Sequence, residues 1–459
     1  MDQQHNKSRF NLIKRVLLCL VVGVLLIVAL LVVLRVGFAA DPSAQVKADV
    51  AQITARRATP SNAYVYLLGM DAPAGVDPMV RGREQLQKYV ASSHATLNDI
   101  LNDSQDMSSP ACSSLTLEKP LQCSLSVKAA CAQTFFSSAA TRKQMLKAYP
   151  DLLARYQQFK TYNDFHQPFA ASFFVADLPY SYLRVGQKLL FLQGIDQAEG
   201  LYPEHQALVA HSLQQTVLDD LAYWRTALIG ADELKLRTLA IQMIHNDLVM
   251  LAAIHVRYGI STPTLALLTT PERSLALVNA NETVMMQLFY RQDQDYQQCG
   301  QHSLSRCASH LMNTLFIDVQ SYVNQVTSAK AHDVALSLLP PAQAYAAKDR
   351  VTPIPWSFWL RNPLSALTVY AEQPGLKDKI FQSADLNLGI TLLNATAKQP
   401  IGRSDTAWLV TIQSPYGSAA SHAHLNPEGW LCLDQALPQD KASLDGCIPW
   451  ARDTTGARY

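Results

Sequence analysis

The sequence lacks the short motifs that mark the common catalytic folds. It contains no G-x-S-x-G nucleophile elbow, no S-x-x-K motif, no H-E-x-x-H zinc site and no glycine-rich phosphate loop. Only 18 of its 459 residues are glycine, so few positions could approach a phosphate group closely. We therefore expect no known type of catalytic centre, no cofactor and no metal, although an enzyme with an unfamiliar site stays open.

Charge is also scarce. Charged residues make up 16% of the chain, against about 25% in an ordinary soluble domain. Beyond residue 40 there are 33 basic and 36 acidic residues, which gives a net charge of −3. A nucleic-acid partner is not expected, because there is no basic stripe that could replace the counterions of a phosphate backbone.

One long apolar run stands out at the N-terminus. Residues 16–34 contain neither charge nor proline, and at about 1.5 Å per residue such a helix nearly crosses a hydrocarbon core of about 30 Å. A cleaved signal peptide has a shorter apolar core, and here Arg35 separates the core from the small residues Gly37 and Ala39. The run favours an uncleaved membrane anchor over a cleaved signal, and over a buried core helix.

The flanking charges orient this anchor. Lys7, Arg9, Lys14 and Arg15 precede the run, whereas Arg35 alone closely follows it. By the positive-inside rule, residues 1–15 stay in the cytosol and the remainder is exported. The expected location is the inner (cytoplasmic) membrane, single-pass, with the bulk of the chain in the periplasm.

Cysteine usage agrees with an oxidising compartment. Cys19 lies in the apolar run and seven cysteines follow it. Close spacing in loop-like sequence favours three disulfides, and it leaves Cys131 over as a small buried apolar side chain. The predicted pairs are Cys299 with Cys307, Cys432 with Cys447, and Cys112 with Cys123.

Helical periodicity dominates the exported part. Apolar stripes predict helices over 139–161, 177–194, 271–292 and 303–328. Residues 204–257 form two stripes joined by a short turn at 229–232, which predicts an antiparallel helical hairpin. The expected fold class is mainly α, as a helical bundle or an irregular α-hairpin domain with a small irregular or β C-terminal tail.

Five segments follow from these features. They are a cytosolic tail (1–15), the membrane anchor (16–36), a helical exported domain (37–338), a Pro- and aromatic-rich connection with further helices (339–402) and a disulfide-bearing C-terminal segment (403–459).

The C-terminal part of the chain carries two further expectations. Residues 407–412 have a strand-like composition. In the connection, Trp356, Phe358 and Trp359 are expected to be covered, since exposed aromatic rings are costly.

Two groups of residues resemble metal ligands. Cys299, His302, Cys307 and His310 have side chains that zinc accepts, but the loop between them is short for a tetrahedral site, and an oxidising compartment favours the disulfide. His422 and His424 alternate along the chain without an evident third ligand, so we interpret them as a surface pair.

Two pairs of acids lie close together in the sequence. Asp71 and Asp77 flank a Pro/Gly-rich turn; we interpret Asp77 as a helix N-cap with Pro78 at the first helical position, in preference to a catalytic carboxylate pair. Asp219 and Asp220 precede Trp224 on a predicted helix, and we interpret both as facing solvent.

Glycosylation sequons occur at Asn102, Asn281 and Asn394. Two of them lie in predicted helices, which argues against their routine use.

The favoured function is a membrane-anchored, non-enzymatic scaffold or interaction protein of the bacterial envelope, with the membrane and other envelope proteins as its partners. One alternative is an envelope hydrolase whose acidic site the sequence does not locate. Another is a small-molecule or lipid-binding helical domain with a cavity lined by Trp356 and Trp359.

Overall fold

The computed structural model describes residues 14, 16–23, 25–26, 29, 41–92, 121, 125, 131–136, 139–168, 178–199, 203–295, 319–347, 354, 356, 358, 377–397, 399, 407–416, 422–426, 430–433 and 446–450. These residues are mainly helical, with short strands near the C-terminus, which confirms the expected fold class in its coarse form. The chain divides into two compact units. The first takes Met1–Ala48, Met286–Ala329 and Val351–Gln373, and the second takes Asp49–Met285, Lys330–Arg350 and Pro374–Tyr459.

The first unit contains the N-terminal apolar run. Its described residues at 16–23, 25 and 26 are helical, and its large apolar side chains are 46–65% exposed. In the same unit, Asn324 holds the start of α2 (Ala44–Arg57), because its side chain accepts from the Ser43 N–H and donates to the Asp41 carbonyl. Asn324 belongs to α16 (Val319–Leu338).

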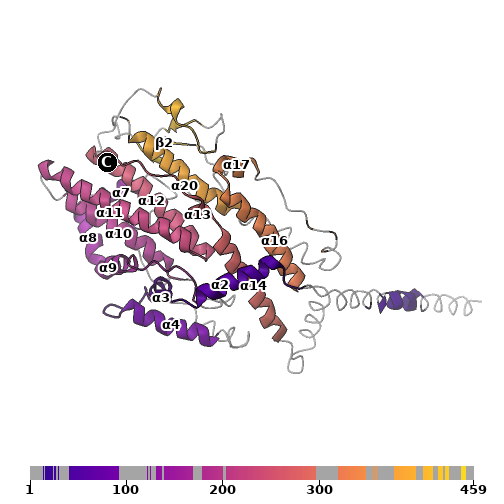
Figure 1. The fold of residues 1–459 in the computed structure, drawn as a ribbon. Helices are drawn as coiled ribbons and strands as arrows, with labels where there is room; N and C mark the ends of the chain where they lie inside the picture. The colour runs from indigo at the N-terminus through magenta and orange to yellow at the C-terminus, as the bar shows by residue number, and fades with distance from the viewer. Residues whose placement is uncertain are drawn as a thin grey trace, which may run out of the picture. The chain divides into compact units, whose positions relative to one another are not determined.

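The second unit is built around α12 (Leu234–Tyr258), which packs against α10 (Tyr180–Glu199), α11 (Pro203–Gly230) and α20 (Lys377–Thr396) (Figure 1). Among the described residues, α12 alone is long and apolar enough to cross a membrane, and 94% of its apolar window is buried. The core helix of a globular domain passes the same test, since it is covered by protein on every side.

The predicted helical hairpin is confirmed by α11 and α12. The two helices pack against each other over a link of three residues, 231–233. Gly259 ends α12 with a φ of +72°, a conformation that favours glycine. Arg237 crosses the interior from α12 and donates to the carbonyls of Leu228 on α11 (2.6 Å) and Glu272 (2.6 Å).

A second, tighter hairpin joins α3 (Asn62–Leu68) to α4 (Pro78–Ser92). The Asp77 side chain accepts a hydrogen bond from the Met79 N–H (2.9 Å), and Pro78 follows it as the first residue of α4. The predicted N-cap is therefore confirmed. The helices approach closely at Gly82, where an added Cβ would lie 1.8 Å from the Val65 carbonyl oxygen.

Two predicted helices are interrupted. The stripe over 139–161 forms two helices, α8 (Ala139–Ala148) and α9 (Pro150–Phe159). Pro150 lacks the N–H that would continue the hydrogen bonds of α8, and it begins the next helix instead. The stretch 271–292 forms a short α13 (Thr270–Arg273) and a separate α14 (Ala276–Asp295). Its cap is Thr269 in a capping box with Glu272, one residue before the predicted Thr270.

The C-terminal segment adds a small antiparallel sheet to the second unit, in the order β1 (His424–Leu425), β2 (Trp430–Cys432) and β3 (Cys447–Pro449). Strand β3 packs against α12, and Trp430 and Trp450 belong to the same hydrophobic core as the helices. The remaining described helices are α7 (Cys131–Phe135) and α17 (Pro341–Ala346).

Two expectations for this part of the chain are wrong. Residues 407–412 form a turn and a 3-10 helix (Leu409–Thr411) in place of a strand. Trp408, Leu409 and Ile412 are buried together, and this spacing suits a helical turn and not an alternating strand. Trp356, expected to be covered, is 74% exposed, while Phe358 is buried. Trp359 lies outside the described residues.

Candidate functional site at a buried acid pair

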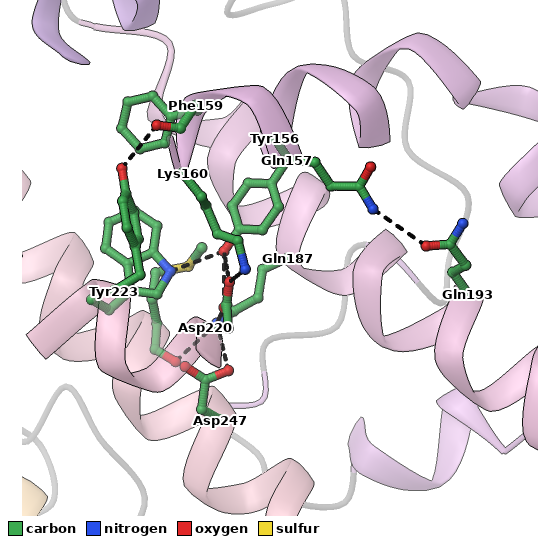
Figure 2. A network of polar contacts seen from close by, with 11 residues as sticks. Tyr156, Gln157, Phe159, Lys160, Gln187, Gln193, Asp220, Tyr223 and Asp247 are labelled. Atoms are coloured by element: carbon green, nitrogen blue, oxygen red, sulfur yellow. Dashed lines mark hydrogen bonds and ion pairs between the residues drawn. The ribbon is translucent and has the colours of Figure 1, made fainter. Parts of the chain in front are cut away.

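Two aspartates meet in the interior of the second unit. Asp220 lies on α11 and Asp247 on α12, and both are fully buried. Gln187 of α10 donates from its amide nitrogen toward Asp220 Oδ2 (2.9 Å) and Asp247 Oδ1 (3.0 Å), so one amide joins the two carboxyl groups (Figure 2). Asn246 donates to the Gln187 carbonyl oxygen (2.9 Å) and thereby fixes which end of that amide faces the acids.

Helix α9 closes the other side of the pair. Tyr156 and Lys160 are one turn apart and therefore share a face. The Tyr156 hydroxyl donates to Asp220 (2.9 Å), and the Lys160 ammonium forms an ion pair with Asp220 Oδ1 at 2.7 Å (Figure 2). Trp224 donates from its indole N–H to the Tyr156 oxygen (2.9 Å). Four helices, α9 to α12, thus contribute to one polar network.

The charges in this network determine its protonation. Lys160 is the cation in contact with the pair among the described residues, and it faces two carboxyl groups. Burial raises the pKa of Asp247 well above its ordinary value, and the charge of nearby Asp220 and a hydrogen bond with it raise it further. Asp247 Oδ2 is buried and accepts no hydrogen bond, so this oxygen can carry a proton without displacing a donor.

The surroundings keep water away from the pair. Phe159, Tyr223 and Trp224 make edge-on or tilted ring contacts with one another, and Tyr223 donates to the Phe159 carbonyl (3.1 Å). Burial raises the pKa of Tyr156 well above its usual range, so this hydroxyl stays protonated and serves as a donor. The arrangement can hold a proton and join helices, but neither acid is accessible to a substrate in this structure.

A second polar cluster surrounds Asp232, just after α11. Its carboxylate accepts from the Gln167 N–H (3.1 Å), and burial raises its pKa to about 6 against the opposing effects of Gln167, Arg56, His166 and Arg57. Arg56 donates to the carbonyl of Gly230 (2.8 Å) and thus binds the end of α11. We assign this cluster to the packing of α2 against the α11–α12 turn.

The interpretation of Asp219 and Asp220 is half wrong. Asp219 is exposed, as predicted, and accepts from Gln215 (2.8 Å), whereas Asp220 is fully buried. The sequence holds a signal for this: Asp220 is three residues after Val217 and four before Trp224, so it shares their buried face. Asp247 carries a similar signal, since it is an acid within an apolar helix.

The predicted disulfides have a mixed outcome. Cys432 and Cys447 lie opposite each other on β2 and β3 and form the expected bond. Cys131 is also in a disulfide, so its assignment as the leftover cysteine is wrong. Cys19 is free.

At least one of the two remaining predicted disulfides needs correction. Cys112, Cys123, Cys299 and Cys307 lie outside the described residues, and Cys131 must take one of these four as its partner. The predicted pairs Cys112 with Cys123 and Cys299 with Cys307 therefore cannot both form, and at least one of them is wrong.

The structure gives no support to a metal site among its described residues, where no group of three or more potential ligands occurs. His422 and His424 are both exposed, on either side of a buried Ala423. The pattern Cys299, His302, Cys307 and His310 lies outside the described residues.

Two sequons have structural roles. Asn281 is buried and accepts from Arg57 (3.0 Å). Asn394 pairs with both the N–H and the carbonyl of Leu265, so glycosylation at either residue would break the fold. Asn102 lies outside the described residues.

No family model, no curated protein and no solved structure matches this chain.

Proposed function

We propose that this chain is a single-pass protein of the bacterial cytoplasmic membrane whose helical units lie in the periplasm. It acts there as a non-enzymatic scaffold or interaction partner for other envelope proteins. The observation that carries the proposal is the contrast between its cysteines: Cys19, inside the apolar run, is free, whereas the other three described cysteines are oxidised. Disulfides persist in oxidising compartments. This contrast therefore supports placing the apolar run in the membrane and the rest of the chain in an oxidising compartment.

The apolar run supports the membrane attachment. Eight leucine and valine side chains in its described helical residues, 16–23, 25 and 26, are about half exposed or more. The sequence carries no charge from residue 16 to residue 34. Such a surface is unfavourable in water and is covered by lipid acyl chains in a bilayer.

The acid pair bears on the choice between scaffold and hydrolase. A hydrolase would use two carboxyl groups of different pKa as acid and base, and Asp220 with Asp247 has that chemistry. Both side chains are fully buried, however, and they are occupied by Gln187 and by Lys160 and Tyr156. Their placement favours a structural role, and with it the non-enzymatic function.

Membrane attachment and orientation can be tested together. We expect the full chain to stay in the membrane fraction after carbonate washing. In spheroplasts, added protease should degrade an epitope fused after residue 459 but spare one fused before residue 1. Leu20→Arg combined with Leu25→Arg should release the chain from the membrane, whereas Leu20→Ile with Leu25→Ile should not. A wild-type chain extracted by carbonate, or an epitope at the C-terminus that is protected, would refute the proposal.

The partner can be sought from α11, which exposes two large apolar side chains among those described, Leu208 (73%) and Ile229 (47%). A photo-crosslinking residue at either position should capture the same envelope protein in intact cells. The matched control places the crosslinker at Ala222, an exposed small residue of the same helix. Equal capture from all three positions would indicate nonspecific contact and count against an interaction role for this helix.

A further inference from the structure

We propose that Asp220 and Asp247 form a proton-dependent latch: the folded helical unit holds one proton between the two carboxyl groups, and separation of the helices α9 to α12 releases it. The inference is independent of the proposed function, since it rests on the interior of the second unit alone.

The geometry of the pair is the first step. Asp220 and Asp247 accept from the same amide nitrogen of Gln187, at 2.9 and 3.0 Å, and neither has any exposed surface. That nitrogen also lies 3.0 Å from the Met243 carbonyl, and its two hydrogens cannot serve three acceptors fully. A proton on Asp247 relieves this shortage, because the protonated carboxyl becomes a donor to Asp220.

The charge balance is the second step. From α9, the acids face the Lys160 ammonium and the Tyr156 hydroxyl; from α11, Tyr223 lies within electrostatic range of Asp220; from α10 the facing group is the neutral amide of Gln187. Burial raises the pKa of both tyrosines, so they stay neutral. One lysine therefore balances one carboxylate, and the second acid is stable there only with its proton.

The direction of the pH effect follows. Burial and Asp220 raise the pKa of Asp247 above the value of about 4 that it has in an unfolded chain. Below pH 4 both the folded and the unfolded chain hold the proton, and the pair contributes its full stabilisation. As the pH rises, the unfolded chain releases a proton that the folded one keeps, so stability falls until the pH exceeds the pKa of the folded state.

The main test compares Asp247→Asn with wild type in urea unfolding of the full chain in detergent, from pH 4 to pH 9. Asparagine imitates the protonated acid but cannot release a proton. The unfolding constant of wild type, divided by that of the variant, should rise by about tenfold per pH unit above pH 4 until Asp247 itself ionises. A ratio that does not change with pH would overturn the latch. Asp220→Asn, which removes the partner of Lys160, is the matched control and should destabilise the chain at every pH.

A second measurement does not depend on folded variants. At pH 8, where Asp232 is ionised, infrared spectra of the wild-type chain should contain the carbonyl band of a buried protonated carboxyl group, shifted on transfer to heavy water. Absence of this band in the folded wild-type chain would overturn the proposal. Where Asp247→Asn folds, it should remove the band.

Discussion

His245 is the buried polar side chain of α12 whose two ring nitrogens both lack a partner in the structure. Burial lowers its pKa from 6.5 to about 4, and no charged neighbour opposes this effect. His255, on the same helix, is also buried but has its Nδ1 at 2.7 Å from the Ile260 carbonyl. The pair therefore separates the cost of burying an imidazole from the value of its hydrogen bond.

We predict that His245 makes the chain sensitive to acid. Above pH 6.5 the ring is neutral in both the folded and unfolded states. As the pH falls from 6.5 towards 4, the unfolded chain takes up a proton that the folded one does not, and the difference amounts to about 3 kcal/mol of stability. His245→Leu should match or exceed wild type at pH 7 and flatten the loss between pH 6.5 and 4 in urea unfolding. His255→Leu should instead destabilise at pH 7, because it leaves the Ile260 carbonyl unpaired. An unchanged acid slope in His245→Leu would contradict this prediction.

Residue-scale features were predictable where the cause is local. The Asp77 cap follows from the neighbouring Pro78 and from the helix that begins there. The acid pair has no such local cause, because Asp220 and Asp247 are 27 residues apart and meet only when α11 folds back on α12. Sequence periodicity placed Trp224 inside correctly but assigned Asp220 to solvent by its charge. Asp220 is buried instead, because Lys160 and Tyr156 supply the ion pair and the hydrogen bond that its carboxylate needs.

Helix packing depends in part on a single side chain, Arg237. It is 1% exposed and contributes to three elements at once, since it starts from α12 and donates to the carbonyls of Leu228 near the end of α11 and Glu272 on α13. Burial lowers its pKa to about 10, which still leaves it charged at neutral pH. Carbonyl oxygens at helix ends attract a cation, because the helix dipole places partial negative charge there.

We predict that Arg237→Leu costs about 3 kcal/mol or more, since it leaves two buried carbonyls without donors. Arg237→Lys should lower the free energy of unfolding by less, because an ammonium group can reach one carbonyl but cannot bond both as the guanidinium does. Thermal and urea unfolding of both variants would measure the order. Equal stability of Arg237→Leu and wild type would show that the hydrogen bonds of Arg237 add nothing to the packing of α11 against α12.

At the scale of elements, periodicity predicted the existence of helices better than their limits. The α11–α12 hairpin was predictable because two long stripes flank a short link. Pro150 and Ser274 interrupt stripes that continue on both sides, so periodicity alone joined α8 to α9 and α13 to α14. Residues 407–412 are rich in strand-forming side chains, yet the core takes Trp408, Leu409 and Ile412 on one side, and tertiary packing overrides the local preference.

For the whole molecule, the cysteines connect the fold to the proposed oxidising compartment. The Cys432–Cys447 bond joins neighbouring strands that lie against α12, and closing a loop of 15 residues contributes about 3 kcal/mol in the chain-entropy model. The Cys131 bond belongs to the short α7, whose side chains also enter the core. A chain that depends on such bonds is less stable in a reducing cytosol, and this physical argument supports the proposed export.

On the proposed membrane location, we predict the oxidation state of the cysteines in the chain as extracted from cells. Alkylation in denaturant without reductant should modify at most four of the eight cysteines: Cys19 should react, and Cys131, Cys432 and Cys447 should not. Reduction should make all eight reactive. The matched control is a chain lacking residues 1–36 and produced in the cytosol, where thioredoxin and glutathione keep thiols reduced, so that its seven cysteines react without reductant. Peptide mass mapping locates each modified residue. Modification of Cys432 or Cys447 without reductant would show that their bond does not form in the cell. It would thereby remove the main support for the proposed exported location.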